Sequence, residues 1–392
     1  KDNSTRLAAV TALGRLKAKG NIDKLIEIVN EDENNFMVKN AVIALGDIAD
    51  PKAVPSLIRA MFFERGVSFY REASYALFQV GKDAVPALME VLAGKSDALK
   101  NLPAKPDPWI IKIKCIEVLS DIGEPKTSEI VMSVLNSIKG GNPAAEVEAP
   151  LQVIAIQKAA SAAGRLGLKP AIPKLKQLST NIDFTQAELP LEALELIGDR
   201  AAGAELIKLA GKDVYMAECK AKYDEESCKN SEEEVRQLRL EAGTRLAGPA
   251  ELAAVEKMEA AEKDAKLKEL IGKEKSRLVA AKECGEKAEC WVGKLKDPNP
   301  KVRDKAGYEL SYLKNPETAA PLLAALKEDD LEALTVRTSA PDVIDADMRT
   351  AGRIGGGLPE VEEDQTRLGL FRVVTPYIVE PEVMIVPRGE YH

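Results

Sequence analysis

The stretch ALGDIADPKAVPSLIRAMF, residues 44–62, carries the pattern that decides the fold. An Ala-Leu step is followed by a short polar break and then by a second apolar run that starts beside a proline. The step recurs along the chain at residues 9, 41, 73 and 115, so the spacings are 32, 32 and 42 residues. The residues of the four steps are Ala9, Ala12 and Leu13; Ala41, Ala44 and Leu45; Ala73, Ala76 and Leu77; and Cys115, Val118 and Leu119.

Each step predicts the buried face of a first helix, because positions i, i+3 and i+4 lie on one side of a helix. Small alanines on that face let a neighbouring helix approach closely. Pro55, Pro86 and Pro173 follow the polar breaks. Proline costs little in the first helical turn, so these residues predict the starts of second helices. The repeating unit is therefore helix, tight turn, helix.

A period of this size, built from paired helices, is typical of an α-solenoid. Residues 44–62 and the segment NPKVRDKAGYELSYLKNPETAAPLLAAL, residues 299–326, resemble the HEAT-repeat family. The resemblance implies an all-α solenoid of about eight HEAT-like helical hairpins over residues 1–333, with a concave face as the default partner-binding surface. It is weak over about 201–284, where the helical character continues with little recurring pattern.

Residues 334–392 lose the Ala-Leu period and gain prolines, a Gly355–Gly357 hinge and short β-branched runs. They predict an extended, partly β tail, which either packs back on the solenoid or docks on a partner. Trp109 is a partner anchor if its ring is exposed and a core residue if it is buried. The candidate partner-binding residues are Trp109, Phe371, Val373, Tyr377, Ile378, Val383 and Ile385.

Three segments lengthen the repeat: residues 94–109, 137–150 and 212–234. Each follows the second helix of a predicted pair, so all three are expected to emerge on one edge of the solenoid. Loop growth costs little entropy, and partner contact is the other explanation. The sequence leaves both open.

The cysteines predict two local disulfides, Cys219 with Cys228 and Cys284 with Cys290, and a buried apolar role for Cys115. Free surface thiols are the first alternative. Zinc is the second, but eight and five residues intervene within the pairs, whereas structural zinc prefers closer spacings often completed by histidine. Disulfides would place the protein in an oxidising compartment, for which the bacterial periplasm is the first choice.

The composition disfavours several kinds of activity. The formal charge of -8, from 55 basic and 63 acidic residues, is unfavourable for binding a phosphate backbone. Apolar runs are too short to span a bilayer. The only histidine is His392, which leaves no Ser-His-Asp triad or histidine-based metal site in the repeats. The sequence therefore predicts no catalytic residue, no cofactor and no metal ligand.

The predicted function is a non-enzymatic scaffold for protein partners, as a structural or assembly component of a bacterial envelope complex. The partner would contact the concave face, the insertion edge or the tail. The alternative is a cytosolic HEAT-like regulatory module acting on an enzyme partner. A third candidate, an enzyme that uses paired carboxylates, requires a deep pocket and carboxyl groups with raised pKa values.

The thiol state separates the first two functions. If both cysteine pairs are oxidised, alkylation of denatured, unreduced protein from its native compartment labels one cysteine, and alkylation after reduction labels five. Intact mass spectrometry measures the difference. Five labelled cysteines before reduction would contradict the periplasmic assignment and favour the cytosolic module.

Overall fold

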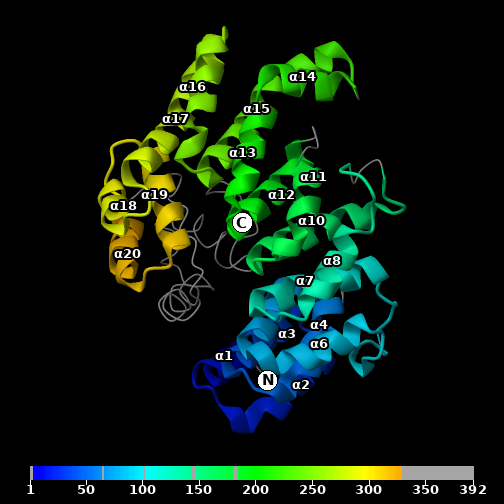
Figure 1. The fold of residues 1–392 in the computed structure, drawn as a ribbon. Helices are drawn as coiled ribbons and strands as arrows, with labels where there is room; N and C mark the ends of the chain where they lie inside the picture. The colour runs from blue at the N-terminus through cyan, green and yellow to red at the C-terminus, as the bar shows by residue number, and fades with distance from the viewer. Residues whose placement is uncertain are drawn as a thin grey trace. The chain divides into compact units, whose positions relative to one another are not determined.

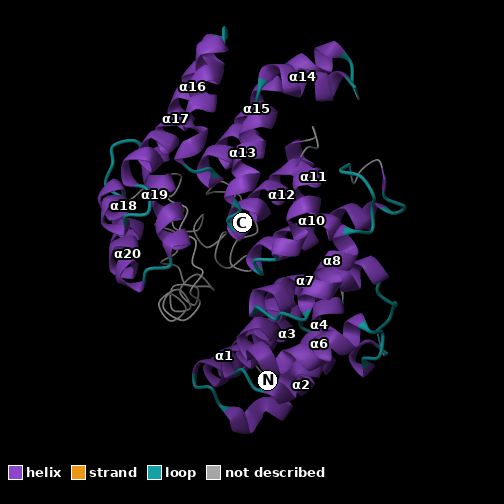
Figure 2. Cartoon of the chain, in the orientation of Figure 1, coloured by secondary structure: helices purple, strands orange, loops and turns teal. Residues whose placement is uncertain are grey.

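The computed structural model describes residues 3–63, 66–100, 102–142, 146–179, 184–221 and 223–328. These residues form α-helices, short 3-10 turns and loops, and no strand occurs among them (Figure 1, Figure 2). The fold is an all-α solenoid, as the sequence predicts. Its contacts divide the chain into two compact units, residues 1–171 and 172–392. The repeat pattern does not mark this division.

Unit 1 consists of helical hairpins in which a first helix is followed by a short turn and a second helix. The pairs are α1 (Asn3–Arg15) with α2 (Ile22–Glu31), α3 (Asn35–Ile48) with α4 (Val54–Phe62), α5 (Tyr70–Val80) with α6 (Val85–Leu92), and α7 (Pro108–Ile122) with α8 (Thr127–Leu135). The unit ends with α10 (Pro150–Arg165) and the 3-10 turn Lys169–Ala171.

The predicted helix starts are confirmed. Pro55, Pro86 and Pro173 are each the second residue of an α-helix, where the missing N–H would have no intrahelical acceptor. Before α4, the side chain of Asp50 accepts a hydrogen bond from the backbone N–H of Lys52 and so caps the connecting turn. Local sequence therefore determines where the hairpins turn.

The first helices of unit 1 pack in chain order, α1 on α3, α3 on α5, α5 on α7 and α7 on α10. The predicted faces of α3, α5 and α7 are buried, including Cys115 in its alanine-like position. Glycines allow the closest approaches. A Cβ atom on Gly14 would lie 2.7 Å from the Cα of Ala44, and one on Gly46 would lie 2.9 Å from the Cα of Ala76.

The prediction is wrong for the first helix. Ala9 and Ala12 of α1 are exposed, and Leu13 is half-buried. Among the described residues, α3 is the only first helix of a hairpin that packs on α1. An alanine face is buried only where a second helix covers it.

Unit 2 is also built from helices. They are α11 (Ile172–Ser179), α12 (Phe184–Ile197), α13 (Arg200–Leu209), α14 (Lys212–Lys220), α15 (Glu225–Leu246), α16 (Leu252–Ala261), α17 (Ala265–Cys284), α18 (Ala288–Lys294), α19 (Pro300–Leu313) and α20 (Ala319–Glu328). Helices α15 and α17 are the longest of them. Helix α15 packs on α13 and α17, and α17 packs on α19. Helix α16 folds back on α17, and α18 packs on α19.

The three lengthened segments differ in structure. Residues 94–109 contain a 3-10 turn at Asp97–Leu99 and lead into α7, and the described part of 137–150 consists of turns and loop. Residues 212–234 are helical instead, because they form α14 and the first half of α15. The third segment is therefore a helical extension rather than a loop. Asp224 caps α15 by accepting a hydrogen bond from the backbone N–H of Ser227.

The close contact at Gly46 gives a stability prediction. Gly46→Ala forces the backbone of α5 away from α3 and should lower the free energy of unfolding by about 1–3 kcal/mol. This loss outweighs the roughly 1 kcal/mol by which alanine favours a helix over glycine. Urea unfolding followed by circular dichroism measures the change.

Gly20→Ala is the matched control, because a Cβ at Gly20 meets nothing within 4 Å. It should change the stability by less than about 0.5 kcal/mol. Equal effects of the two substitutions would show that α3 and α5 do not depend on this contact.

Candidate functional site

The structure brings both predicted cysteine pairs to disulfide distance. The Cα atoms of Cys219 and Cys228 lie 5.7 Å apart, and those of Cys284 and Cys290 lie 5.3 Å apart. Each pair joins two helices, α14 to α15 and α17 to α18. Cys115 is the free cysteine and is fully buried, and burial raises the pKa of its thiol. A thiol in this state is a poor nucleophile.

The two tryptophans have different environments. Trp291 is fully buried in the core around α17, α18 and α19, where its Nε1–H donates to the carbonyl of Gly285. Trp109 is half-buried at the start of α7, and the ammonium group of Lys112 lies 4.1 Å from its ring centroid. Trp109 is therefore neither a core residue nor an open anchor. The other candidate partner residues, Phe371, Val373, Tyr377, Ile378, Val383 and Ile385, lie outside the described residues.

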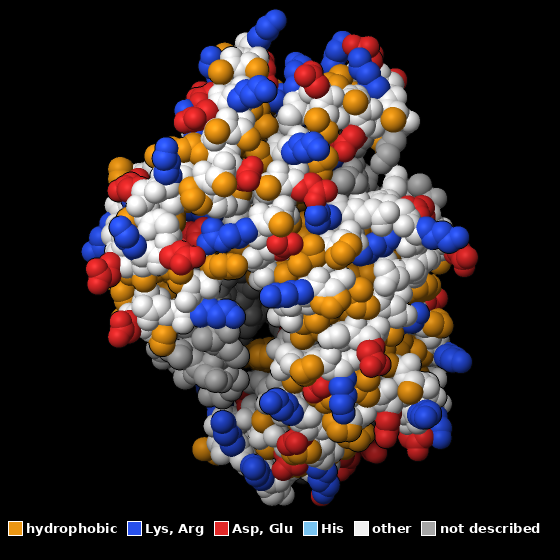
Figure 3. Space-filling view, in the orientation of Figure 1, with side chains coloured by type: hydrophobic (Ala, Val, Ile, Leu, Met, Phe, Trp, Pro, Cys, Tyr) orange, Lys and Arg blue, Asp and Glu red, His pale blue; other side chains and the backbone are white. Residues whose placement is uncertain are grey.

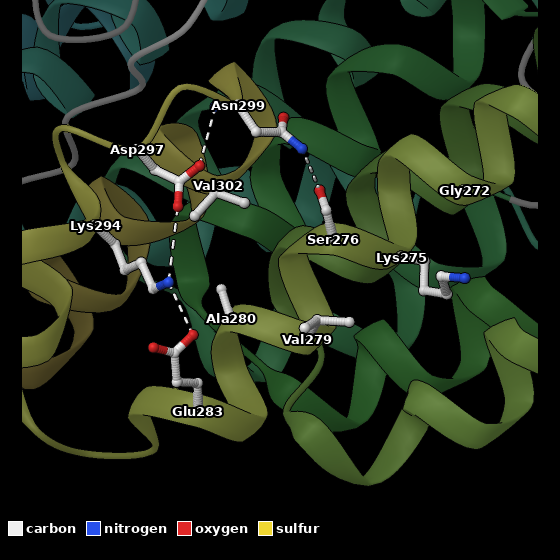
Figure 4. A pocket seen from close by; sticks show the side chains of 10 residues that line it. All are labelled: Gly272, Lys275, Ser276, Val279, Ala280, Glu283, Lys294, Asp297, Asn299 and Val302. Carbon is white, nitrogen blue, oxygen red and sulfur yellow. Dashed lines mark hydrogen bonds and ion pairs between the residues drawn. The ribbon is translucent and has the colours of Figure 1, made fainter.

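A shallow groove runs along the exposed side of α17 and is closed by the start of α19 (Figure 4). The floor is formed by three apolar residues. Ala280 and Val302 are buried, and Val279 is 46% exposed. Helical spacing places the α17 contributors on one face. The lining residues are Gly272, Lys275, Ser276, Val279, Ala280, Glu283, Lys294, Asp297, Asn299 and Val302.

The polar residues of the groove already have partners. Lys294 is paired with Glu283 at 2.8 Å and with Asp297 at 3.7 Å, and the hydrogen bond to Glu283 raises the pKa of Lys294. The side-chain amide of Asn299 donates to the hydroxyl of Ser276 at 3.0 Å (Figure 4). These contacts hold α17 and the start of α19 together, and Val279 is the exposed apolar residue of the groove.

The size of the groove indicates what it can accept. Its volume is about 270 Å³, whereas small-molecule sites usually hold roughly 300–1,000 Å³ and enclose most of the ligand. This groove is open along its length, so it does not enclose a ligand as such sites do.

A second feature of unit 2 is a buried charge network that the sequence analysis missed. Asp304 of α19 lies between two arginines, with its Oδ2 atom 2.9 Å from Nε of Arg245 and 2.7 Å from Nη2 of Arg277. Arg245 also pairs with Glu195 of α12 at 2.7 Å. These contacts join four helices, α12, α15, α17 and α19.

The network extends along α19. Lys301 pairs with Glu241 and Glu274, each at 2.9 Å. Lys305 is fully buried, donates to the carbonyl of Ala247 at 2.9 Å and pairs with Glu309 at 2.8 Å. The cations are Arg200, Arg245, Arg277, Lys301 and Lys305, and the carboxylates are Glu195, Glu241, Glu274, Asp304 and Glu309, so the charges balance.

The pKa values of the network are those of structural ion pairs. Burial would raise the pKa of Asp304, but Arg245 and Arg277 reverse this effect and hold the pKa well below its usual range. Burial lowers the pKa of Lys305 to about 8, against the opposing effect of Glu309. In the described part of the chain, every carboxyl group whose pKa departs clearly from its ordinary value has a lowered pKa; these groups are Glu117, Asp224, Glu225, Glu241, Glu262, Glu269 and Asp304. A general acid needs the opposite shift.

The described residues also lack other features of catalytic or membrane sites. Among them, no group of three or more His, Cys, Asp or Glu side chains is arranged to hold a metal ion. None of the described helices is both long and apolar enough to cross a bilayer. On the face of the units drawn in Figure 3, basic and acidic side chains are intermingled, and no broad area has a single sign.

Comparison with known proteins agrees with the hairpin geometry. The family model for HEAT repeats matches residues 1–62, which form α1 to α4. Over these first two hairpins the chain is similar to HEAT-repeat proteins. HEAT repeats generally mediate protein–protein interaction, and HEAT-repeat solenoids are typically non-enzymatic scaffolds. The matched repeats thus suggest protein partners.

Other comparisons add little. No curated protein matches the chain. Among solved structures, the crystal structure of an engineered protein is 15% identical, with 96% of each chain covered and a TM-score of 0.33. At this TM-score the two backbones do not superpose closely.

The network gives a prediction for Asp304. Asp304→Asn leaves Arg245 and Arg277 buried with one fewer carboxylate, so it should lower the free energy of unfolding by about 3–5 kcal/mol. Because the pKa of Asp304 is lowered in the folded state, its contribution is present above about pH 4 and is lost as the pH falls further. Urea unfolding at pH 7 and between pH 5 and pH 2 measures both effects.

The variant should therefore show a weaker loss of stability on acidification than the wild type. Glu27→Gln is the control, because Glu27 and Lys24 form an exposed pair and the change should cost less than about 0.5 kcal/mol. If Asp304→Asn behaved like Glu27→Gln, the network would not stabilise unit 2.

Proposed function

We propose that this protein is a HEAT-like, non-enzymatic scaffold of a bacterial envelope complex and that it holds a protein partner in the groove along α17. The observation that carries the proposal is the exposed apolar floor at Val279 within a groove whose polar groups are already paired. A partner that buries this floor leaves no polar group of the groove without its hydrogen bonds, which keeps the cost of desolvation low.

The length of the groove suggests the form of the partner segment. Gly272 and Glu283 bound the α17 side, and eleven helical rises of 1.5 Å make this side about 16 Å long. An extended chain covers that length with about five residues. The proposed ligand is therefore a short extended segment of a partner protein with an apolar side chain over Val279.

The envelope location is supported by the cysteine pairs. Two pairs lie at disulfide distance within helical hairpins, and disulfides persist in oxidising compartments such as the periplasm. The tail, residues 334–392, is proposed as a second attachment to the same complex, on the basis of its short apolar runs.

Site-specific photo-crosslinking tests the groove. Val279 is replaced by p-benzoyl-L-phenylalanine in the cells that produce the protein, and the adduct is identified by mass spectrometry. A specific adduct with one partner protein is expected. Lys273 is the control position, because it is exposed on α17 but lies about 120° around the helix from Val279.

The identified partner is then titrated against purified variants. Val279→Glu should weaken its binding at least tenfold, because the partner would bury an unpaired carboxylate, and Lys273→Glu should change it less than about threefold. Equal adducts at positions 279 and 273, or equal effects of the two substitutions, would contradict the groove as a binding site.

A further inference from the structure

The two cysteine pairs at disulfide distance differ in how far they are buried. Cys219 and Cys228 are 1% and 0% exposed and lie in a small core with Tyr215. In the other pair Cys284 is 1% exposed, but Cys290 is half-buried at the start of α18. A thiolate must reach a sulfur atom in order to break a disulfide, so access decides which pair is reduced in the folded protein.

The turn between Cys284 and Cys290 is open to solvent. Gly285, Glu286 and Lys287 are all exposed, and they connect the end of α17 to the start of α18. This turn gives a reductant an approach to Cys290. The α18 crosslink, Cys284–Cys290, is therefore the more accessible of the two pairs.

Helix α18 depends on its ties to the neighbouring helices. It has seven residues, and a helix of that length is not stable by itself in water. Trp291 is fully buried in the core that α18 shares with α17 and α19, and its Nε1–H donates to the carbonyl of Gly285 at 2.8 Å. Lys294 pairs with Glu283, but this pair is partly exposed and contributes little. The α18 crosslink adds a covalent tie at the first turn of α18.

The same helix lines one part of the groove. Lys294 and Asp297 line it from α18 and the turn that follows, and Val279 and Glu283 line it from α17 (Figure 4). Cys290 lies four residues before Lys294, so the two side chains lie on one face of α18. The crosslink that holds Cys290 against α17 therefore also holds Lys294 at the groove.

We propose that the α18 crosslink is a redox-reactive site that controls binding in the groove along α17, and that its reductant is a dithiol. The inference rests on the proposed function of the groove and adds its regulation. One thiolate of the dithiol attacks Sγ of Cys290, the S–S bond breaks, and Cys284 leaves as a thiolate that takes a proton. The second thiolate of the dithiol then attacks the reductant sulfur of the mixed disulfide and releases Cys290, which is protonated in turn. Two electrons and two protons pass to the cysteine pair, and the reductant becomes a disulfide.

The reduced protein is expected to keep its fold. Cys284 lies in the apolar core with Trp291, where a neutral thiol packs as a small apolar residue. The ion pairs of Asp304 do not involve the cysteines, so they continue to hold α15, α17 and α19 together. Reduction therefore acts on α18, whose first turn is no longer tied to α17, and on the part of the groove that carries Lys294.

Selective reduction tests the reactive site without any partner. The folded protein is incubated with dithiothreitol, samples are quenched with excess N-ethylmaleimide in denaturant, and the labelled peptides are quantified by mass spectrometry. Cys284 and Cys290 should gain label about tenfold faster than Cys219 and Cys228, while Cys115 is labelled from the start. No gain of label, equal rates, the reverse order, or full label on Cys284 and Cys290 before dithiothreitol is added would overturn the proposal.

Hydrogen–deuterium exchange tests the consequence for α18. Reduction should speed the exchange of the backbone N–H groups of residues 291–295 about tenfold and leave α10 unchanged. The double variant Cys284→Ala/Cys290→Ala should exchange fast in α18 with or without dithiothreitol. The matched control Cys219→Ala/Cys228→Ala should exchange slowly in α18 until it is reduced. Unchanged exchange in α18 after reduction would overturn the control of the groove.

Titration of the partner identified through position 279 gives the third measurement. The reduced protein and Cys284→Ala/Cys290→Ala should each bind it about tenfold more weakly than the oxidised protein, because Lys294 is no longer held at the groove. Cys219→Ala/Cys228→Ala should bind it within about threefold of the wild type. If circular dichroism shows that this control has lost helix content, the comparison of oxidised with reduced wild type still decides the outcome.

The outcomes also separate the two proposals. An adduct at Val279 with equal binding before and after reduction would refute the redox control and leave the scaffold function intact. Selective reduction of the α18 crosslink without an adduct at Val279 would refute the groove and its control, and keep the reactive disulfide. Neither selective reduction nor an adduct would refute both.

Discussion

A helical hairpin exposes an apolar face that it cannot bury alone, so in both units each hairpin must pack on a neighbouring one. In unit 1 the face is covered by the first helix of the next hairpin, at distances that only small residues allow. Gly14 against Ala44 and Gly46 against Ala76 show how close the backbones come. Ala9 and Ala12 of α1 are exposed because no helix of the described residues covers them.

Unit 2 satisfies the same constraint with different chemistry. Its first helices meet through the ion pairs around Asp304, and the charges cancel within the network. A buried network of this kind is a weak source of net stability, because each charge has lost its water. It does penalise any shift of α15, α17 and α19 along one another, since a displaced helix would leave an unpaired charge. The network therefore contributes geometric precision to the surfaces that these helices present.

The proposed binding groove depends on this precision. It is formed where α17 and the start of α19 are held together, and its polar residues are paired with one another in making that contact. Rigid presentation reduces the entropy that binding costs.

The sequence by itself determined the repeating unit, its helix starts and the cysteine pairs, because these depend on local spacing and on proline chemistry. It did not reveal the regularity of about 201–284, where buried charges replace the Ala-Leu steps. Arg236, Arg239 and Arg277 look like solvated residues when read along the chain, yet all three are buried. Only the tertiary structure decided which carboxylates neutralise them, since Asp304 lies 27 residues from Arg277 along the chain. The groove could not be predicted for the same reason, because exposure is a property of the packed helices and not of the residue.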